Sequence, residues 1–127
     1  MITYTEITEG LKVSVRAFFL EERSDPLKHE FFFIYFVTLE NHGSEPVKLL
    51  RRHWDIHDSG AAAYEVNGEG VVGEQPEIKS GTTYHYNSFC VLKSFGGSME
   101  GTYTMQREDG STFEAMIPKF HLAARLN

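Results

Sequence analysis

The segment of the sequence most typical of a β-strand is Glu30-Phe-Phe-Phe-Ile-Tyr-Phe-Val-Thr-Leu-Glu-Asn41. Side chains alternate between the two faces of a β-strand, so one face would carry Phe31, Phe33, Tyr35, Val37 and Leu39. The opposite face would carry Phe32, Ile34 and Phe36. A strand that is apolar on both faces is either covered on both or exposes a patch that binds a partner. We therefore treat Phe32, Ile34 and Phe36 as candidate partner-binding residues.

The next strand is predicted over residues 47–58, which include Leu49-Leu-Arg-Arg-His-Trp-Asp-Ile-His-Asp58. Alternation places one set of side chains beside Trp54 in the core: Leu50, Arg52, Trp54 and Ile56. The other face would carry a charged set: Arg51, His53, Asp55 and His57.

The rest of the chain repeats this pattern of short alternating runs separated by turn residues. Further strands are expected at residues 3–8, 11–20, 63–66, 82–92, 99–105 and 113–117, the last ending before Pro118. Residues 21–29 form a polar loop, and no twelve-residue segment has a helical apolar period. About seven to eight strands predict an all-β, antiparallel sandwich of the immunoglobulin/fibronectin type III-like kind, with residues 1–127 as one domain.

The amino-acid composition disfavours several classes of function. The net charge of −6 disfavours a nucleic-acid partner, because it repels a phosphate backbone. Cys90 is the only cysteine, which fits a reducing compartment. The N-terminus lacks a signal-peptide pattern, and no run approaches the roughly 20 apolar residues that span a bilayer. We expect a cytoplasmic protein that does not insert into a membrane.

Three glycines, Gly68, Gly70 and Gly73, form a GxGxxG pattern. A dinucleotide site requires a helix directly after this pattern, and Pro76 instead favours extended backbone. Glycines at positive φ can also point successive N–H groups at an anion without any helix. The structural interpretation, in which the glycines serve turns and close packing, is the favoured one.

No catalytic or metal-binding set emerges from the residues. His53 and His57 would lie ~13 Å apart along one strand, so a metal site would need His42, His85 or His121 from across the sheet. Cys90 lies inside an alternating strand, as expected of a buried and inert thiol. We expect no enzyme activity, no cofactor and no specific metal site.

Several ordered motifs together resemble the ApaG family: the run from Leu49 to Asp58, Val66-Asn-Gly-Glu-Gly-Val-Val-Gly-Glu-Gln-Pro76, Met99-Glu-Gly-Thr-Tyr103 and Ile117-Pro-Lys-Phe-His-Leu122. The resemblance covers nearly the whole chain. It implies a fibronectin type III-like sandwich in a bacterial protein tied to cobalt and magnesium efflux or resistance. Related domains in eukaryotic F-box proteins and a polymerase-delta-interacting protein are implied to mediate protein contacts.

The family resemblance also implies pyrophosphate or nucleotide binding at the glycine loop. In this chain that would fall on Gly68, Gly70 and Gly73, with charge partners Arg51, Arg52 and His53. Our leading expectation is a non-enzymatic binding module that mediates protein-protein contacts. The alternative is a pyrophosphate or nucleotide sensor with an indirect role in cobalt and magnesium homeostasis. The expected partners are an unidentified protein, a second copy as a homodimer, or a pyrophosphate-containing ligand.

Overall fold

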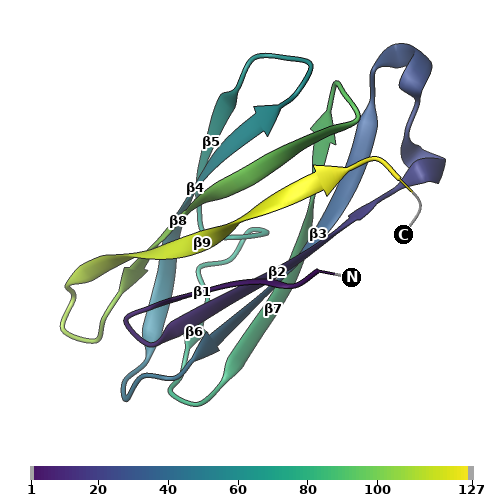
Figure 1. Cartoon of the computed structure of the whole chain (residues 1–127). Helices are drawn as coiled ribbons and strands as arrows, with labels where there is room; N and C mark the ends of the chain where they lie inside the picture. The colour runs from purple at the N-terminus through teal and green to yellow at the C-terminus, as the bar shows by residue number, and fades with distance from the viewer. Residues whose placement is uncertain (1, 126–127) are drawn as a thin grey trace.

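The computed structural model describes residues 2–125 and consists of two antiparallel sheets packed face to face (Figure 1). The first sheet has the order β1-β2-β3-β7: β1 (Tyr4–Thr8), β2 (Leu11–Phe19), β3 (Phe31–Asn41) and β7 (Thr83–Leu92). The second has the order β5-β4-β8-β9: β5 (Tyr64–Glu69), β4 (Val47–Asp58), β8 (Gly96–Gln106) and β9 (Thr112–Ala123). A short strand, β6 (Glu77–Ile78), pairs with the start of β4.

The predicted immunoglobulin/fibronectin type III-like sandwich is confirmed. The described part of the chain has nine strands, and β6 is the one that the sequence pattern did not indicate. The polar loop after β2 contains two single-turn 3₁₀ helices, η1 (Glu21–Arg23) and η2 (Pro26–Lys28). No helix within residues 2–125 is long and apolar enough to cross a membrane.

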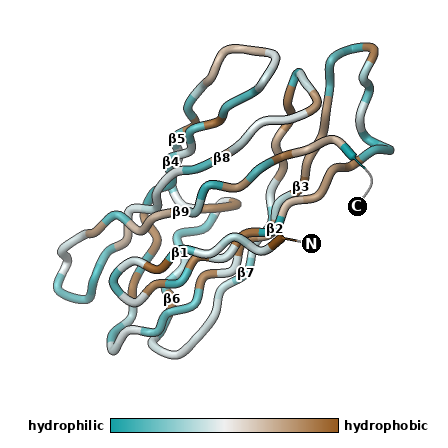
Figure 2. Tube along the Cα trace, in the orientation of Figure 1, coloured by the Kyte–Doolittle hydropathy of each residue, from teal (hydrophilic) through white to brown (hydrophobic). Residues whose placement is uncertain are grey.

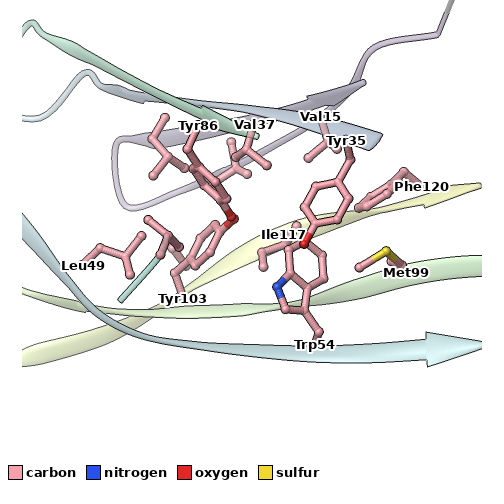
Figure 3. Packing of buried hydrophobic residues seen from close by; sticks show 14 of the residues in the cluster. Val15, Tyr35, Val37, Leu49, Trp54, Tyr86, Met99, Tyr103, Ile117 and Phe120 are labelled. Carbon is pink, nitrogen blue, oxygen red and sulfur yellow. The ribbon is translucent and has the colours of Figure 1, made fainter. Parts of the chain in front are cut away.

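The core fills the space between the sheets with the inward side chains of both (Figure 3). Its centre is aromatic: the Trp54 ring lies 5.4 Å from Tyr35 and 5.9 Å from Phe120, centroid to centroid. The hydroxyls of Tyr86 and Tyr103, which come from opposite sheets, form a hydrogen bond with each other. Buried tyrosines need such partners, because an unpaired buried hydroxyl costs about 1–3 kcal/mol.

One predicted core position is wrong. Leu49 is fully buried and Leu50 is only half-buried, although alternation placed Leu50 beside Trp54 in the core. The register between β4 and β8 shifts between Leu49 and Arg51, which marks a β-bulge. The extra residue turns Leu49 inward before the bulge, while Arg52, Trp54 and Ile56 keep the predicted side.

Two predicted strand ends are also wrong. β9 does not stop before Pro118 but continues to Ala123, because the register against β8 shifts between Met99 and Gly101 and leaves room for a proline. β5 does not end at residue 66 but runs to Glu69. Gly68 therefore lies inside a strand rather than in a loop.

Candidate functional site

The glycine pattern is divided between a strand and a tight hairpin. Gly68 pairs with Arg52 in the β4–β5 ladder, and only Gly70 and Gly73 of the three have positive φ, +58° and +79°. Val71 and Glu74 exchange backbone hydrogen bonds of 2.8 and 3.0 Å across the intervening turn. The Gly70 N–H donates to Leu50 O at 2.8 Å. These amides are occupied within the protein and do not converge on a solvent-facing anion site.

Each of the first two glycines leaves room for a specific neighbour. A Cβ on Gly68 would lie 2.6 Å from the guanidinium carbon of Arg52, and one on Gly70 would lie 1.9 Å from Glu74 O. Arg52 Nη1 donates to Glu69 O at 3.1 Å and to Gly70 O at 2.8 Å. Arg52 therefore holds the end of β5 against β4, and Gly68 accommodates it.

Of the six residues predicted to bind pyrophosphate, the structure brings Arg52 together with Gly68, Gly70 and Gly73 but not with Arg51 and His53. Alternation along β4 turns Arg52 towards the interior of the sandwich, while Arg51 and His53 lie on the outer face of their sheet. Arg52 donates hydrogen bonds to backbone carbonyls of the glycine loop. It was expected instead to contact an anion bound to that loop. Pyrophosphate binding stays a prediction without a converged set of donors.

His53 belongs to a small polar group on the outer face of β4 and β5. Its Nδ1 lies 2.7 Å from Asn67 Oδ1, and its Nε2 lies 3.1 Å from Asp55 Oδ1. The Asn67 hydrogen bond is the main cause that raises the pKa of His53 above 6.5, and Asp55 raises it further. The protonated ring satisfies both acceptors at once.

Two members of this polar group, His53 and Asp55, also form a set with Glu65. Within residues 2–125 it is the one set of His, Cys, Asp and Glu side chains whose ligand atoms could surround a metal ion. One ligand atom each from His53, Asp55 and Glu65 lies within 4.8 Å of the others. An ion bound at Nε2 would have to displace the proton that Asp55 stabilises. His85, one of the three histidines that a metal site would have needed, lies on β7 in the other sheet, and its Nδ1 is 3.1 Å from Thr38 Oγ1.

Asp58 at the end of β4 anchors the turn between β7 and β8. Its carboxylate accepts hydrogen bonds from the Lys93 N–H at 2.6 Å, the Ser94 hydroxyl at 2.5 Å and the Gly60 N–H at 3.1 Å. Burial alone would raise the pKa of Asp58, but these hydrogen bonds outweigh it and lower the pKa below 3.8.

Cys90 is buried, as its place in the alternating strand predicted. The pKa of its thiol is raised to about 11, chiefly by burial and to a smaller extent by the nearby Asp58, while a hydrogen bond with Tyr64 opposes the rise. The pKa of Tyr64 is itself raised to about 12, first by burial and then by its proximity to Cys90. A thiol in this state supplies little thiolate at neutral pH, so it is poorly suited to nucleophilic catalysis.

The candidate partner-binding residues Phe32, Ile34 and Phe36 all lie on the outer face of β3. The register places Phe18 of β2 opposite Ile34, and two residues of β7, Phe89 and Val91, opposite Ile34 and Phe32. We call these six the outer aromatic face: Phe18, Phe32, Ile34, Phe36, Phe89 and Val91. Much of β3 is correspondingly brown in Figure 2.

The outer aromatic face is accessible. Phe89 is 50% exposed, Val91 is 40% and Phe36 is 36%. The Arg23 guanidinium lies 5.6 Å from the ring centre of Phe32 and 5.5 Å from that of Phe89, in cation–π geometry. The sequence could not assign Phe18, Phe89 and Val91 to this face, because strand pairing is needed to bring them beside β3.

A cleft of about 260 Å³ adjoins this face where the two sheets separate between β5 and β7. Its wall on the β5 side includes Tyr64 and Val66, and its wall on the β7 side includes Phe89, Cys90 and Val91. A neighbouring cavity of about 170 Å³ lies between Arg52 and the turn at Val72 and Gly73.

Comparison with known proteins gives consistent matches. The model of the ApaG domain family, DUF525, matches residues 21–107. A protein named ApaG from Anaeromyxobacter dehalogenans (strain 2CP-C) is 48% identical over 93% of this chain and 93% of its own. A Mesorhizobium japonicum protein of the same name is 44% identical over 94% of this chain and 92% of its own.

Solved structures agree with the sequence relatives. The crystal structure of the putative ApaA protein from Bordetella pertussis has a TM-score of 0.86 and 39% sequence identity, and the match covers 97% of both chains. A second solved chain, a structural-genomics target, has a TM-score of 0.84 and 41% identity, and the match covers 90% of this chain and 86% of that one.

Proposed function

This chain belongs to the ApaG domain family, and from that premise we propose that it is a non-enzymatic module that binds another protein through the outer aromatic face. The observation that carries the proposal is the continuous patch of apolar side chains that three strands contribute to one side of the first sheet, of which Phe36, Phe89 and Val91 are exposed and the others half-buried. Contiguous apolar patches of this kind commonly mark interaction surfaces in proteins.

The composition of the face supports a protein partner. Four of its six residues are phenylalanines, and aromatic side chains together with arginine are enriched in the energetically important centres of interfaces. The Phe18 and Phe36 rings meet edge to face with centroids 5.7 Å apart. Both rings are therefore already positioned before a partner arrives, which lowers the entropy cost of binding.

The charges around the face support an acidic partner. Arg16, which pairs with Phe36 across β2 and β3, and Arg23 have no carboxylate partner within residues 2–125. The protein as a whole carries a net charge of −6, and Arg23 shares η1 with Glu21 and Glu22, so a partner carboxylate would bind at the two guanidinium groups and not over a broad basic surface. Complementary charge at an interface chiefly accelerates association and selects the partner.

The chemistry of the interior supports a binding role over an enzymatic one. The thiol of Cys90 is held protonated by burial. The carboxylate of Asp58 is committed to hydrogen bonds that close a turn. Neither group is presented to a substrate as a nucleophile or a base.

The proposal is tested by retention of proteins from an extract of the source cells. We would compare the wild-type protein with a Phe36→Ser/Phe89→Ser double variant, in which both replaced side chains are already at least 36% exposed. The matched control is Met116→Ser, which removes an apolar side chain that is 48% exposed on the other sheet. We expect the wild-type protein and the control to retain a common protein that the double variant loses. Equal retention by all three would refute a role for this face.

A further inference from the structure

Strand β7 is an edge strand without the usual protection. Its ten residues, Thr83-Tyr-His-Tyr-Asn-Ser-Phe-Cys-Val-Leu92, include no charged residue, no proline and no glycine. Natural edge strands are commonly short, charged, interrupted by proline or a bulge, or covered, because an open edge pairs with other chains. β7 therefore has the composition of a strand that pairs on both sides.

The other edges of the two sheets do carry such protection in the described part of the chain. β1 has only five residues. β5 carries Glu65 and Glu69 and contains Gly68. β9 contains Pro118 at a bulge, and its Met116 N–H donates to Thr8 Oγ1 at 3.0 Å. The contrast makes β7 the edge that is open to a further strand.

The backbone groups at the free edge can be identified from the ladder. Asn41 N–H donates to Thr82 O at 3.1 Å, whereas the Thr82 N–H donates to Lys79 O, so the first bond alone marks this end of the β3–β7 ladder as the position of a hydrogen-bonded pair. In an antiparallel ladder such pairs alternate, which directs every second residue of β7 towards β3 and the others towards the free edge. The residues with outward N–H and C=O groups are Thr83, His85, Asn87, Phe89 and Val91. Within residues 2–125, no hydrogen bond reaches these outward backbone atoms.

The surroundings of the edge suit an extended, apolar segment. Side chains of an added strand would alternate between the outer aromatic face and the cleft between the sheets. On the outer side they would meet Phe89 and Val91, and on the inner side Tyr64 and Val66. The cleft of about 260 Å³ is large enough for side chains and does not require the core to open.

We propose that β7 docks an extended segment of the partner protein as an additional antiparallel or parallel strand, with apolar residues at alternate positions and a carboxylate beside Arg23. This inference rests on the proposed function and adds the mode of binding and the chemistry of the bound segment. Strand addition obtains affinity from backbone hydrogen bonds and specificity from pockets for alternate side chains.

The charges favour a different protein over a second copy of this chain. A second copy paired through the same edge would add a second net charge of −6, and its β7 would place no carboxylate beside Arg23, because β7 contains no acidic residue. An acidic segment instead neutralises Arg23, whose guanidinium lies 5.5 Å from the ring centre of Phe89 at the edge itself.

The test uses the full chain and a displayed library of random peptides of ten residues, the length of β7. Selected peptides should alternate apolar residues with polar or acidic ones and lack central proline. The key variant is Asn87→Pro, which removes an N–H that points away from β3 and so leaves the ladder intact. Its matched control is Asn87→Ala, which keeps that N–H. We expect the selected peptide to bind Asn87→Pro about tenfold more weakly than the control, a loss of about 1.4 kcal/mol that one hydrogen bond can account for.

Amide hydrogen exchange gives a second readout that does not depend on the proline variant. Peptide binding should protect the amides of alternate residues, Thr83, His85, Asn87, Phe89 and Val91, and leave those of Tyr84 and Tyr86 at their existing protection. An increase in amide protection at every residue of β7, or at none, when the peptide binds would overturn strand addition. So would a selection that yields no enriched peptide.

The variants separate this inference from the proposed function. Peptide binding that is lost in Phe36→Ser/Phe89→Ser but unchanged in Asn87→Pro would overturn the docking edge and leave the outer aromatic face as the binding surface. Binding that is unchanged in both would overturn both. A dimer in light scattering that Asn87→Pro converts to a monomer would overturn the peptide assignment, because the occupant of the edge would then be a second copy.

Discussion

A pair of glycine substitutions tests whether the GxGxxG pattern is a structural device. Gly70 and Gly73 both have positive φ, and both belong to the pattern that suggested an anion site. Their surroundings differ: a Cβ on Gly70 would lie 1.9 Å from Glu74 O, whereas one on Gly73 meets no atom within 4 Å. Gly70→Ala and Gly73→Ala therefore share the same backbone strain and differ only in the clash.

The difference in free energy of unfolding follows from what the clash displaces. Alanine at positive φ costs about 1 kcal/mol at either site. In Gly70→Ala, Glu74 must also move, which breaks its two backbone hydrogen bonds with Val71, worth about 1 kcal/mol each. Val71 is 1% exposed, and its partial release from the core adds roughly 1 kcal/mol. We expect a loss of about 4 kcal/mol for Gly70→Ala against about 1 kcal/mol for Gly73→Ala.

Urea unfolding followed by tryptophan fluorescence measures both values, because Trp54 is buried at 2% exposure and reports the native core. The midpoints should separate while the slopes stay equal. In a thermal scan the gap of about 3 kcal/mol should appear as roughly 10 °C between the two variants. Equal stabilities of the two variants would refute the packing argument. A stable Gly70→Ala protein that has lost the pyrophosphate binding of the wild-type protein in calorimetry would support the anion-site interpretation instead.

Three further predictions follow from the pKa shifts. Asp58 has a lowered pKa, so its contribution to stability is present above the unfolded value of 3.8 and is lost as the pH falls through the folded value. Asp58→Asn should therefore flatten the acid side of the stability curve, and an unchanged slope would contradict the assignment. His53 should titrate above 6.5 by nuclear magnetic resonance, and Asn67→Ala should lower that pKa; an equal value in both proteins would show that Asn67 is not the cause. Cys90 should react with a thiol reagent far more slowly at pH 8 than in urea, because its pKa is about 11 in the folded protein; equal rates would mean that the thiol is accessible and ionised.

The strands were predictable from the sequence because alternation has a physical cause at each position. Phe33 and Leu39 lie on the same face of β3 because side chains alternate along a strand, and both face the core, where they are at most 1% exposed. The bulge at Leu49 was not predictable, since Leu49 and Leu50 are both leucines and either could face the core. Pro118 was read as the end of a strand, although an edge strand with a bulge tolerates a proline.

The candidate site was predictable only in part. Phe32, Ile34 and Phe36 were identified because a strand that is apolar on both faces is visible in one segment. The role of Arg52 in holding β5 against β4 could not be identified from the sequence, because it depends on Gly68, which lies opposite on another strand. The open edge of β7 was invisible for a similar reason: the order of the strands in a sheet is a property of the whole chain.

The motifs that identify the family lie mainly at positions that packing already explains. Gly68 accommodates Arg52, and Gly70 accommodates Glu74 O. A Cβ on Gly101 would lie 1.9 Å from His53 O in the neighbouring strand, so that glycine permits β8 to approach β4. Similarity in such motifs is evidence for a shared sandwich more than for a shared ligand. Under the proposed function, the surfaces that distinguish one partner from another would lie elsewhere, on the outer aromatic face and the free edge of β7, where Phe36, Phe89 and Val91 are at least 36% exposed.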